Sequence, residues 1–308
     1  MRPDLSICIP NYNHAGYLAA AIESALNQRN VVVEVLVSDN CSSDHSAEII
    51  SSFAHDHRLR AYTQSTTIPM TEHWNVVLPD VRGEWVVWLC SDDVLLPDFA
   101  ENAFTLAQTE CVSAVFLDYD FLVGNERVSK PSFYDSDGFI RAEDQFRILL
   151  KSNNWPLTGT MIRTEFVRQI GGFNPSYKFC PDWHMWLDLT SLYSKHLVGN
   201  ISTASFLYRH HEDAVTNEWV LERDPLCEID KMKKSFINRF LPYHEREIYR
   251  AFADRQLIKL ARSFAEVAKL KECEIAAKNY ERYAAKLEAR NHPDLPSGPP
   301  GPPYPLPQ

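Results

Sequence analysis

The 308-residue sequence predicts an α/β protein with a mostly parallel sheet and helices on both faces. Two observations lead to this prediction. Short apolar runs of strand length alternate with segments of helical period over residues 5–108, and three of those runs end in Asn or Asp. Alternating strands and helices are typical of parallel sheets, because a helix usually makes the crossover between parallel strands. Ligands of such sheets bind at the carboxyl ends of the strands.

The first strand and helix set the pattern that the rest of the region repeats. LSICIP, residues Leu5–Pro10, is a short apolar run closed by proline, which predicts a buried strand. Leu18, Ile22, Ala25 and Leu26 then recur at helical spacing, which predicts a helix over residues 15–28. By the same criteria, strands are expected at 31–39, 59–64 and 84–90, and helices at 42–54, 71–78 and 97–108.

The remaining chain divides into a less regular middle and a helical end. Strands are expected at 113–123, 157–167 and 204–216, and helices at 141–152 and 181–193. Residues 226–290 are rich in Ala, Glu, Lys, Arg and Leu, which indicates two or three helices. The proline-rich end cannot bury a core, so we expect it to be disordered. The predicted domains are 1–220, a helical extension at 221–291 and the tail at 292–308.

Charge and cysteine usage limit the class of protein. The formal net charge is −10, which argues against nucleic acid as a partner. The seven cysteines are odd in number and form no C-x-x-C pair, as is typical of reduced thiols in a cytosolic protein. No run approaches the roughly 18 apolar residues of a membrane span. We therefore expect a cytoplasmic protein.

Two adjacent carboxylates follow the apolar run of WVVWLCSDDVLLPD. Asp92 and Asp93 repel each other and resist burial at the end of a buried strand. Asp93 could cap the next helix, but capping needs only one carboxylate. The pair therefore favours a divalent cation of the Mg²⁺ or Mn²⁺ type, which takes oxygen ligands and shares them with phosphates. Neither phosphate-binding glycine motif, G-x-x-x-x-G-K-[ST] or G-x-G-x-x-G, occurs in the chain.

Six motifs in a fixed order resemble an inverting family 2 glycosyltransferase with the GT-A fold. They cover about residues 4–217 and read ICIPNYN, EVLVSDNCSSDHS, EHWN, GEWVVWLCSDDVLLPD, GGFNPSYKFCPDWHMWLDL and YRHHEDAVT. The resemblance implies a nucleoside-diphosphate sugar donor, with UDP or dTDP favoured, and Mn²⁺ or Mg²⁺ as cofactor. It also implies a saccharide or lipid-linked acceptor and a role in cell-surface polysaccharide or glycoconjugate synthesis.

The same resemblance assigns residues to the site. The donor nucleotide would be held by Pro10, Asn11, Asn13, Asp39, Asn75 and Asp92. Asp39 would accept hydrogen bonds from the base, although an Asp in SDNCSSD is also typical of a turn. The metal ligands would be Asp92, Asp93 and His211, although paired histidines are often only polar surface.

Asp182 matches the catalytic base of the family, and it also suits a helix N-cap. Two positions depart from the family pattern. Cys90 stands where the first Asp of the commoner D-x-D-D form is, and Pro181 replaces the usual Glu before Asp182. A single base carboxylate implies inversion by one displacement, unlike glycoside hydrolysis, which needs two carboxylates.

Two alternative functions, and the role of one basic and apolar segment, are also considered. A nucleotidylyltransferase would need a glycine-rich phosphate loop that NYNHAGYL lacks. A non-catalytic nucleotide-sugar binder or scaffold fits the Cys90 and Pro181 departures. KMKKSFINRF (231–240) mixes basic and apolar residues. It suits either peripheral contact with the inner face of a membrane or packing on the domain or on a second subunit, as in a homo-oligomer.

Overall fold

The computed structural model describes residues 2–109, 111–211, 220–221 and 225–289. The chain forms two compact units. Unit 1 comprises Met1–Gln145 and Asn154–His211, and unit 2 comprises Phe146–Asn153 and Glu212–Gln308. The division predicted from sequence, at residues 220 and 291, stays a prediction, and the tail at 292–308 lies outside the described residues.

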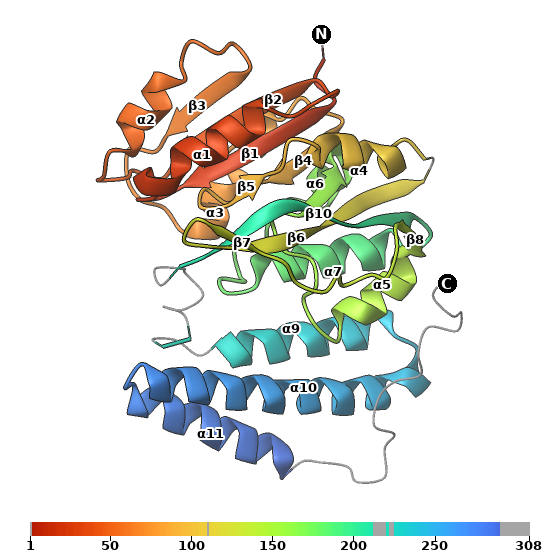
Figure 1. The fold of residues 1–308 in the computed structure, drawn as a ribbon. Coiled ribbons are helices and arrows are strands. Elements are labelled where there is room, and N and C mark those ends of the chain that lie inside the picture. Colours follow the sequence, from red (N-terminus) through yellow and green to blue (C-terminus); the bar gives the residue numbers. More distant parts are fainter. Residues whose placement is uncertain (1, 110, 212–219, 222–224, 290–308) are drawn as a thin grey trace. The chain divides into compact units, whose positions relative to one another are not determined.

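One ten-stranded sheet forms the centre of unit 1 (Figure 1). The strand order is β3-β2-β1-β4-β9-β6-β10-β5, with β7 beside β6 and β8 beside β10. The strands are β1 (Leu5–Asn11), β2 (Val33–Asp39), β3 (Leu59–Thr63), β4 (Trp85–Trp88), β5 (Val94–Leu95), β6 (Val112–Val123), β7 (Glu126–Val128), β8 (Gly138–Arg141), β9 (Thr160–Arg163) and β10 (Leu197–His210).

The strands that carry the candidate site run parallel. β1 pairs in parallel with β2 and β4, and β2 with β3. The register sets Asn11 opposite Asp39, so the carboxyl ends of β1 and β2 are side by side. β9 is antiparallel to both β4 and β6, and it joins the two halves of the sheet.

Helices lie against both faces of this sheet, as predicted. The α-helices described before residue 211 are α1 (Ala15–Leu26), α2 (Ser46–Ser52), α3 (Met70–Asn75), α4 (Phe99–Ala107), α5 (Ala142–Leu149), α6 (Thr164–Ile170) and α7 (Pro181–Leu192). All belong to unit 1 except the second half of α5, which belongs to unit 2. The buried residues of α1 and α4 share one core with Ile7, Val35 and Val87 of the sheet. Phe116 stacks on Trp155, whose carbonyl accepts a hydrogen bond from Trp186 of α7. The α/β fold is therefore confirmed.

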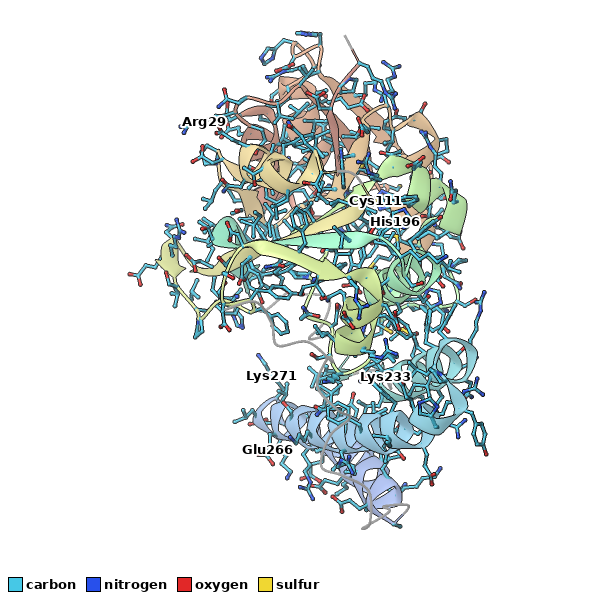
Figure 2. The ribbon with its side chains drawn as sticks, turned by 90° about the vertical axis from the view of Figure 1, so that its right-hand side faces the viewer. Arg29, Cys111, His196, Lys233, Glu266 and Lys271 are labelled. Atoms are coloured by element: carbon cyan, nitrogen blue, oxygen red, sulfur yellow. The ribbon has the colours of Figure 1, made fainter. Side chains whose placement is uncertain are left out.

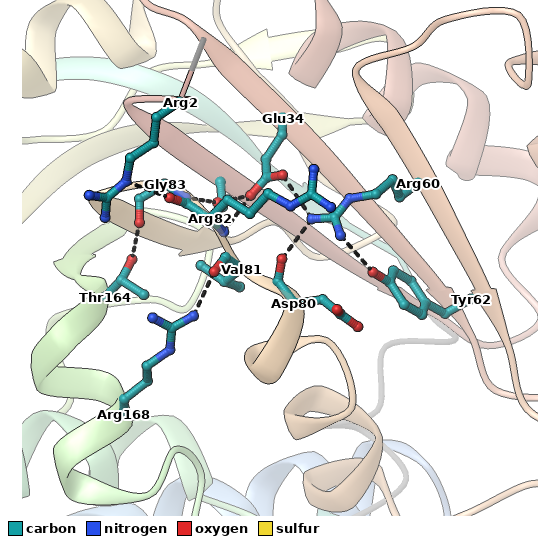
Figure 3. A network of polar contacts seen from close by, with 11 residues as sticks. Arg2, Glu34, Arg60, Tyr62, Asp80, Val81, Arg82, Gly83, Thr164 and Arg168 are labelled. Atoms are coloured by element: carbon teal, nitrogen blue, oxygen red, sulfur yellow. Dashed lines mark hydrogen bonds and ion pairs between the residues drawn. The ribbon is translucent and has the colours of Figure 1, made fainter.

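A polar network fastens the amino ends of the strands (Figure 3). Buried Glu34 of β2 accepts hydrogen bonds from the Ser6 hydroxyl (2.5 Å) and the Arg82 main chain (2.7 Å), and it pairs with Arg60 (2.8 Å). Gly83 has no space for a side chain, because a Cβ there would lie 2.6 Å from the Ser6 nitrogen. The network ties the loop that leads into β4 to β1 and β2.

Unit 2 contains the helices α9 (Pro225–Phe240), α10 (Tyr243–Leu270) and α11 (Glu274–Glu288). Met232, Phe236 and Ile237 of α9 are buried. Lys233, labelled in Figure 2, is buried with them and donates to the Lys151 carbonyl of the same unit (3.0 Å). The apolar part of the 231–240 segment is thus packed inside the protein. Among the described residues, no helix is both long enough and apolar enough to span a bilayer.

Candidate functional site

The polar ends of β1, β2 and β4 meet at one edge of the sheet, as the sequence predicts. The Asn11 amide donates to Asp39 Oδ1 across the first two strands (2.8 Å). His14 follows β1, and its Nδ1 lies 2.9 Å from the hydroxyl of Ser91, which follows β4. One contact therefore joins the ends of β1 and β2, and another joins the segments that follow β1 and β4.

Asp39 is buried and forms the turn that its sequence context suggests. Its Oδ1 accepts from the Ser42 hydroxyl (2.6 Å), and its Oδ2 accepts from the Ser42 main chain (2.9 Å). Each carboxylate oxygen can accept two hydrogen bonds. Oδ2 therefore keeps accepting capacity beyond the Ser42 bond, so the turn and a ligand contact are compatible.

The other donor-site residues after β1 have distinct environments. Pro10 is the last residue but one of β1, opposite Ser38. Asn13 has a left-handed backbone (φ 54°), which Asn tolerates, and its Oδ1 accepts from the Ser43 main chain (2.8 Å). Asn11 is buried, and its Oδ1 has no hydrogen-bond donor among the described residues. A buried acceptor without a donor is costly, so Asn11 is suited to a donor from outside the chain.

Asp93 is buried beside β10 and caps no helix. Its Oδ2 accepts from the Thr158 hydroxyl (2.6 Å), and its Oδ1 accepts from the Arg209 main chain (2.9 Å). The following helix, α4, has Asp98 at its N-cap, so the capping alternative for Asp93 is wrong. Burial, together with repulsion by Asp92, raises the pKa of the Asp93 carboxyl, and the two hydrogen bonds only partly offset this rise.

Asp92 is held by the last residues of β10 and the loop after it. Its Oδ2 lies 2.9 Å from His211 Nε2, and its carbonyl accepts from the Arg209 side chain (2.6 Å). The Tyr17 ring of α1 contacts both partners, with its centroid 5.1 Å from the His211 ring and 4.8 Å from the Arg209 guanidinium. Tyr17 thus supports the two basic groups that reach Asp92.

Cys90, Asp92 and Asp93 could together hold a metal ion. One ligand atom from each lies within 4.8 Å of the other two. Carboxylate oxygens suit Mg²⁺ and Mn²⁺, so the two Asp side chains of this set fit the expected cation. His211 is not in this group, and its Nε2 lies against the Asp92 carboxylate.

Asp182 is in the first turn of α7, after Pro181. The N-cap is Cys180, so Asp182 does not occupy the capping position itself. Burial and the two neighbouring Asp carboxylates raise the pKa of the Cys90 thiol, and the charge of Asp182 adds to this rise. Asp182 is therefore within electrostatic range of the β4 end.

Asn75 is hydrogen-bonded to the loop at residues 172–173. Its amide donates to the Phe173 carbonyl (2.7 Å) and accepts from the Phe173 main chain (2.9 Å). Gly172 lies against it with a left-handed backbone (φ 73°), and a Cβ there would lie 2.4 Å from Asn75 Oδ1. The described contacts of Asn75 are thus with the 172–173 loop, and no described contact joins it to the other site residues.

Several residues of this site were not predicted from the sequence, among them Ser42, Thr158 and Tyr17. Thr158 precedes Gly159, where a side chain has no space, because a Cβ there would lie 2.6 Å from the Leu117 carbonyl oxygen. That glycine was the one available signal for Thr158. Tyr17 carries no signal, because one aromatic residue in an amphipathic helix usually belongs to the core.

Comparison with known proteins identifies related sequences. The family described as Glycosyl transferase family 2 matches residues 6–170, which is more than half of the chain. An uncharacterized glycosyltransferase of Nostoc is 26% identical over 65% of this chain and 61% of its own length. The succinoglycan biosynthesis protein ExoO of Rhizobium meliloti is 35% identical over 31% of this chain and 27% of its own. The chain thus spans less than two thirds of these curated relatives.

Solved structures show the same fold. S. aureus TarS 1-349, determined in complex with UDP-GlcNAc, aligns with a TM-score of 0.60 and 15% identity over 94% of this chain and 93% of its own. The mannosyltransferase PcManGT of Pyrobaculum calidifontis, with GDP-Man and Mn²⁺, aligns with a TM-score of 0.57 and 15% identity over 94% and 87%. The fold is that of GT-A glycosyltransferases, and with the family match over residues 6–170 it establishes that this chain belongs to glycosyl transferase family 2.

Proposed function

We propose that the chain is an inverting glycosyltransferase that moves a sugar from a nucleoside-diphosphate sugar, with UDP or dTDP as nucleotide, to a hydroxyl of a saccharide or lipid-linked acceptor. The observation that carries this proposal is that β1 pairs in parallel with both β2 and β4, so that Asp39 at the end of β2 and Asp92–Asp93 after β4 lie at the same edge of the sheet. The donors bound by the two structural neighbours support a nucleotide-sugar donor. The succinoglycan relative supports a role in polysaccharide or glycoconjugate synthesis.

The nucleotide would lie over the ends of β1 and β2. Asp39 would accept from the base N–H, using the capacity that its bonds to Ser42 leave. Asn11 would use its unpaired buried oxygen nearby, and Pro10 and Asn13 would form the rim. Asn75 would act through the 172–173 loop that it holds.

The diphosphate would lie at the end of β4, where Asp92 and Asp93 would hold the divalent cation. When bound, Mn²⁺ or Mg²⁺ supplies charge neutralisation for the departing diphosphate. The Arg209 guanidinium and the His211 ring, both within reach of Asp92, would add positive charge or hydrogen bonds at the same place.

Asp182 would be the base that takes the proton of the acceptor hydroxyl as that oxygen attacks the anomeric carbon. A general base of this kind contributes about 10²–10⁴-fold to the rate. Because only one carboxylate takes part, the displacement is single and the anomeric configuration inverts. Pro181 fixes the first turn of α7, so it sets the position of Asp182 without replacing the missing Glu.

Calorimetric titration with a panel of nucleoside diphosphates tests the donor site. In Mn²⁺, UDP or dTDP should bind, and a chelator or the double change Asp92→Ala/Asp93→Ala should abolish binding. Glu84→Ala, an exposed carboxylate at the opposite end of β4, is the matched control and should leave binding unchanged. If no nucleotide binds in either condition, the donor assignment is wrong, and the alternative of a scaffold protein is favoured.

Cytoplasmic localisation, peripheral membrane contact and a homo-oligomer through the C-terminal helices stay predictions. The buried apolar residues of the 231–240 segment favour packing over membrane contact for that segment. A flotation assay with anionic vesicles checks the membrane alternative, which requires the full chain to float with the lipid.

A further inference from the structure

The site at the end of β4 contains a sulfur atom beside its two carboxylates. Cys90 Sγ belongs to the group whose ligand atoms lie within 4.8 Å of one another, together with one oxygen each from Asp92 and Asp93. This distance allows all three atoms to contact one ion. A carboxylate-only site is suited to Mg²⁺ and Mn²⁺, whereas thiolate sulfur favours softer ions.

The surrounding residues hold Cys90 in place. The Thr158 hydroxyl accepts from the Cys90 main chain (3.1 Å) and donates to Asp93 Oδ2 (2.6 Å), so one side chain ties two members of the group together. The Arg209 side chain holds the Asp92 carbonyl, and His211 contacts the Asp92 carboxylate. Cys90 is therefore part of a fixed arrangement and differs from Cys111 and Cys227, which are exposed.

Negative charge is concentrated around the sulfur. Asp92 and Asp93 flank it, and the charge of Asp182 also reaches it. A divalent cation in contact with Cys90, Asp92 and Asp93 would supply positive charge at the centre of this group.

We infer that Cys90 Sγ is a ligand of the cation at this site, and that the sulfur shifts the metal preference of the chain from Mg²⁺ toward softer ions. The inference rests on the proposed function, which supplies the cation. The thiol proton passes to solvent as the sulfur binds the ion. Introducing a carboxylate with Cys90→Asp should reverse the preference.

The test titrates the full-length chain with Cd²⁺ alone and records the sulfur-to-cadmium charge-transfer absorption in the ultraviolet. The wild type and the control Cys111→Ser should share a saturable band that Cys90→Ser lacks. The wild type and Cys90→Ser share the other six cysteines, so their difference spectrum isolates Cys90, and Cys111→Ser shows what the loss of one exposed thiol alone removes. In competition titrations, Cys90→Asp should bind Cd²⁺ more weakly and Mg²⁺ more tightly, each by at least roughly tenfold, the scale that even outer-shell changes reach.

Calorimetry with Mn²⁺ and UDP on the same preparations separates this inference from the proposed function. Identical Cd²⁺ bands in the wild type and Cys90→Ser, with UDP binding intact, would overturn the sulfur ligand and leave the donor site standing. Absence of both metal and UDP binding would overturn both. If Cys90→Asp does not fold, as judged by circular dichroism, the nearly isosteric Cys90→Ser still decides the question.

Discussion

At the scale of single residues, the site depends on groups that hold the carboxylates as well as on the carboxylates themselves. Thr158 is buried and has both roles of its hydroxyl in use, as acceptor from Cys90 and donor to Asp93. Asp39 has the same kind of support from Ser42. Such supporting residues determine whether charged side chains at a buried strand end keep a fixed position.

Thr158→Val should therefore destabilise the protein by about 1–3 kcal/mol, because Asp93 and the Cys90 main chain lose their partner in a buried place. Thr158→Ser keeps the hydroxyl and should recover most of that loss. Urea unfolding of the three proteins measures the difference. Equal stability of the Val and Ser variants would show that the hydroxyl has no such role.

At the scale of elements, buried carboxylates also anchor the segment that follows β7. Asp118 of β6 accepts from the Lys130 ammonium (2.5 Å), the Ser132 hydroxyl (2.6 Å) and the Phe133 main chain (2.8 Å). Burial works against ionisation of Asp118, but these hydrogen bonds outweigh it and lower the pKa of the carboxyl. A single residue of the sheet thus holds residues 130–133 in place.

The lowered pKa gives a defined pH dependence. A carboxyl whose pKa is lower in the folded than in the unfolded state stabilises fully above the unfolded value of about 3.9, and the stabilisation is lost as pH falls below it. Asp118→Asn should therefore lower the free energy of unfolding by a constant amount between about pH 7 and pH 5, on the order of 1.5–3 kcal/mol. The gap to the wild type should narrow only below about pH 4. Urea unfolding across this pH series measures it, and a gap that shrinks already between pH 7 and pH 5 would contradict the account.

The elements also show how far sequence reasoning reaches. The strands β1–β4 and the helices α1, α4 and α7 were predictable, because each is a sustained apolar run or an amphipathic segment. The two-residue β5 and the three-residue β7 are too short to show any period. The antiparallel placement of β9 between β4 and β6 depends on tertiary packing, which no local pattern encodes. The carboxylates at the strand ends were predictable because charged residues are unusual directly after a buried strand. Tyr17 was not, because one aromatic residue in an amphipathic helix usually belongs to the core.

At the scale of the whole molecule, the net negative charge of the chain determines what the site must provide for a diphosphate. A protein of formal net charge −10 that binds a diphosphate must supply positive charge locally. The described residues at the end of β4 offer a carboxylate and thiol group for a cation, with Arg209 and His211 beside it. This arrangement suits the metal dependence that we propose.

The central claim is that Asp182 activates the acceptor while the Asp92–Asp93 end holds the donor. The most direct measurement compares nucleoside diphosphate binding with the release of nucleoside diphosphate from the matching sugar donor as the sugar is transferred to an added saccharide acceptor or to water, for the wild type and Asp182→Asn in Mn²⁺. The account predicts unchanged binding and a rate that falls by about 10²–10⁴-fold. Release at the wild-type rate by Asp182→Asn would contradict the assignment of the base, and no release by the wild type with any donor that binds would favour a non-catalytic binding protein.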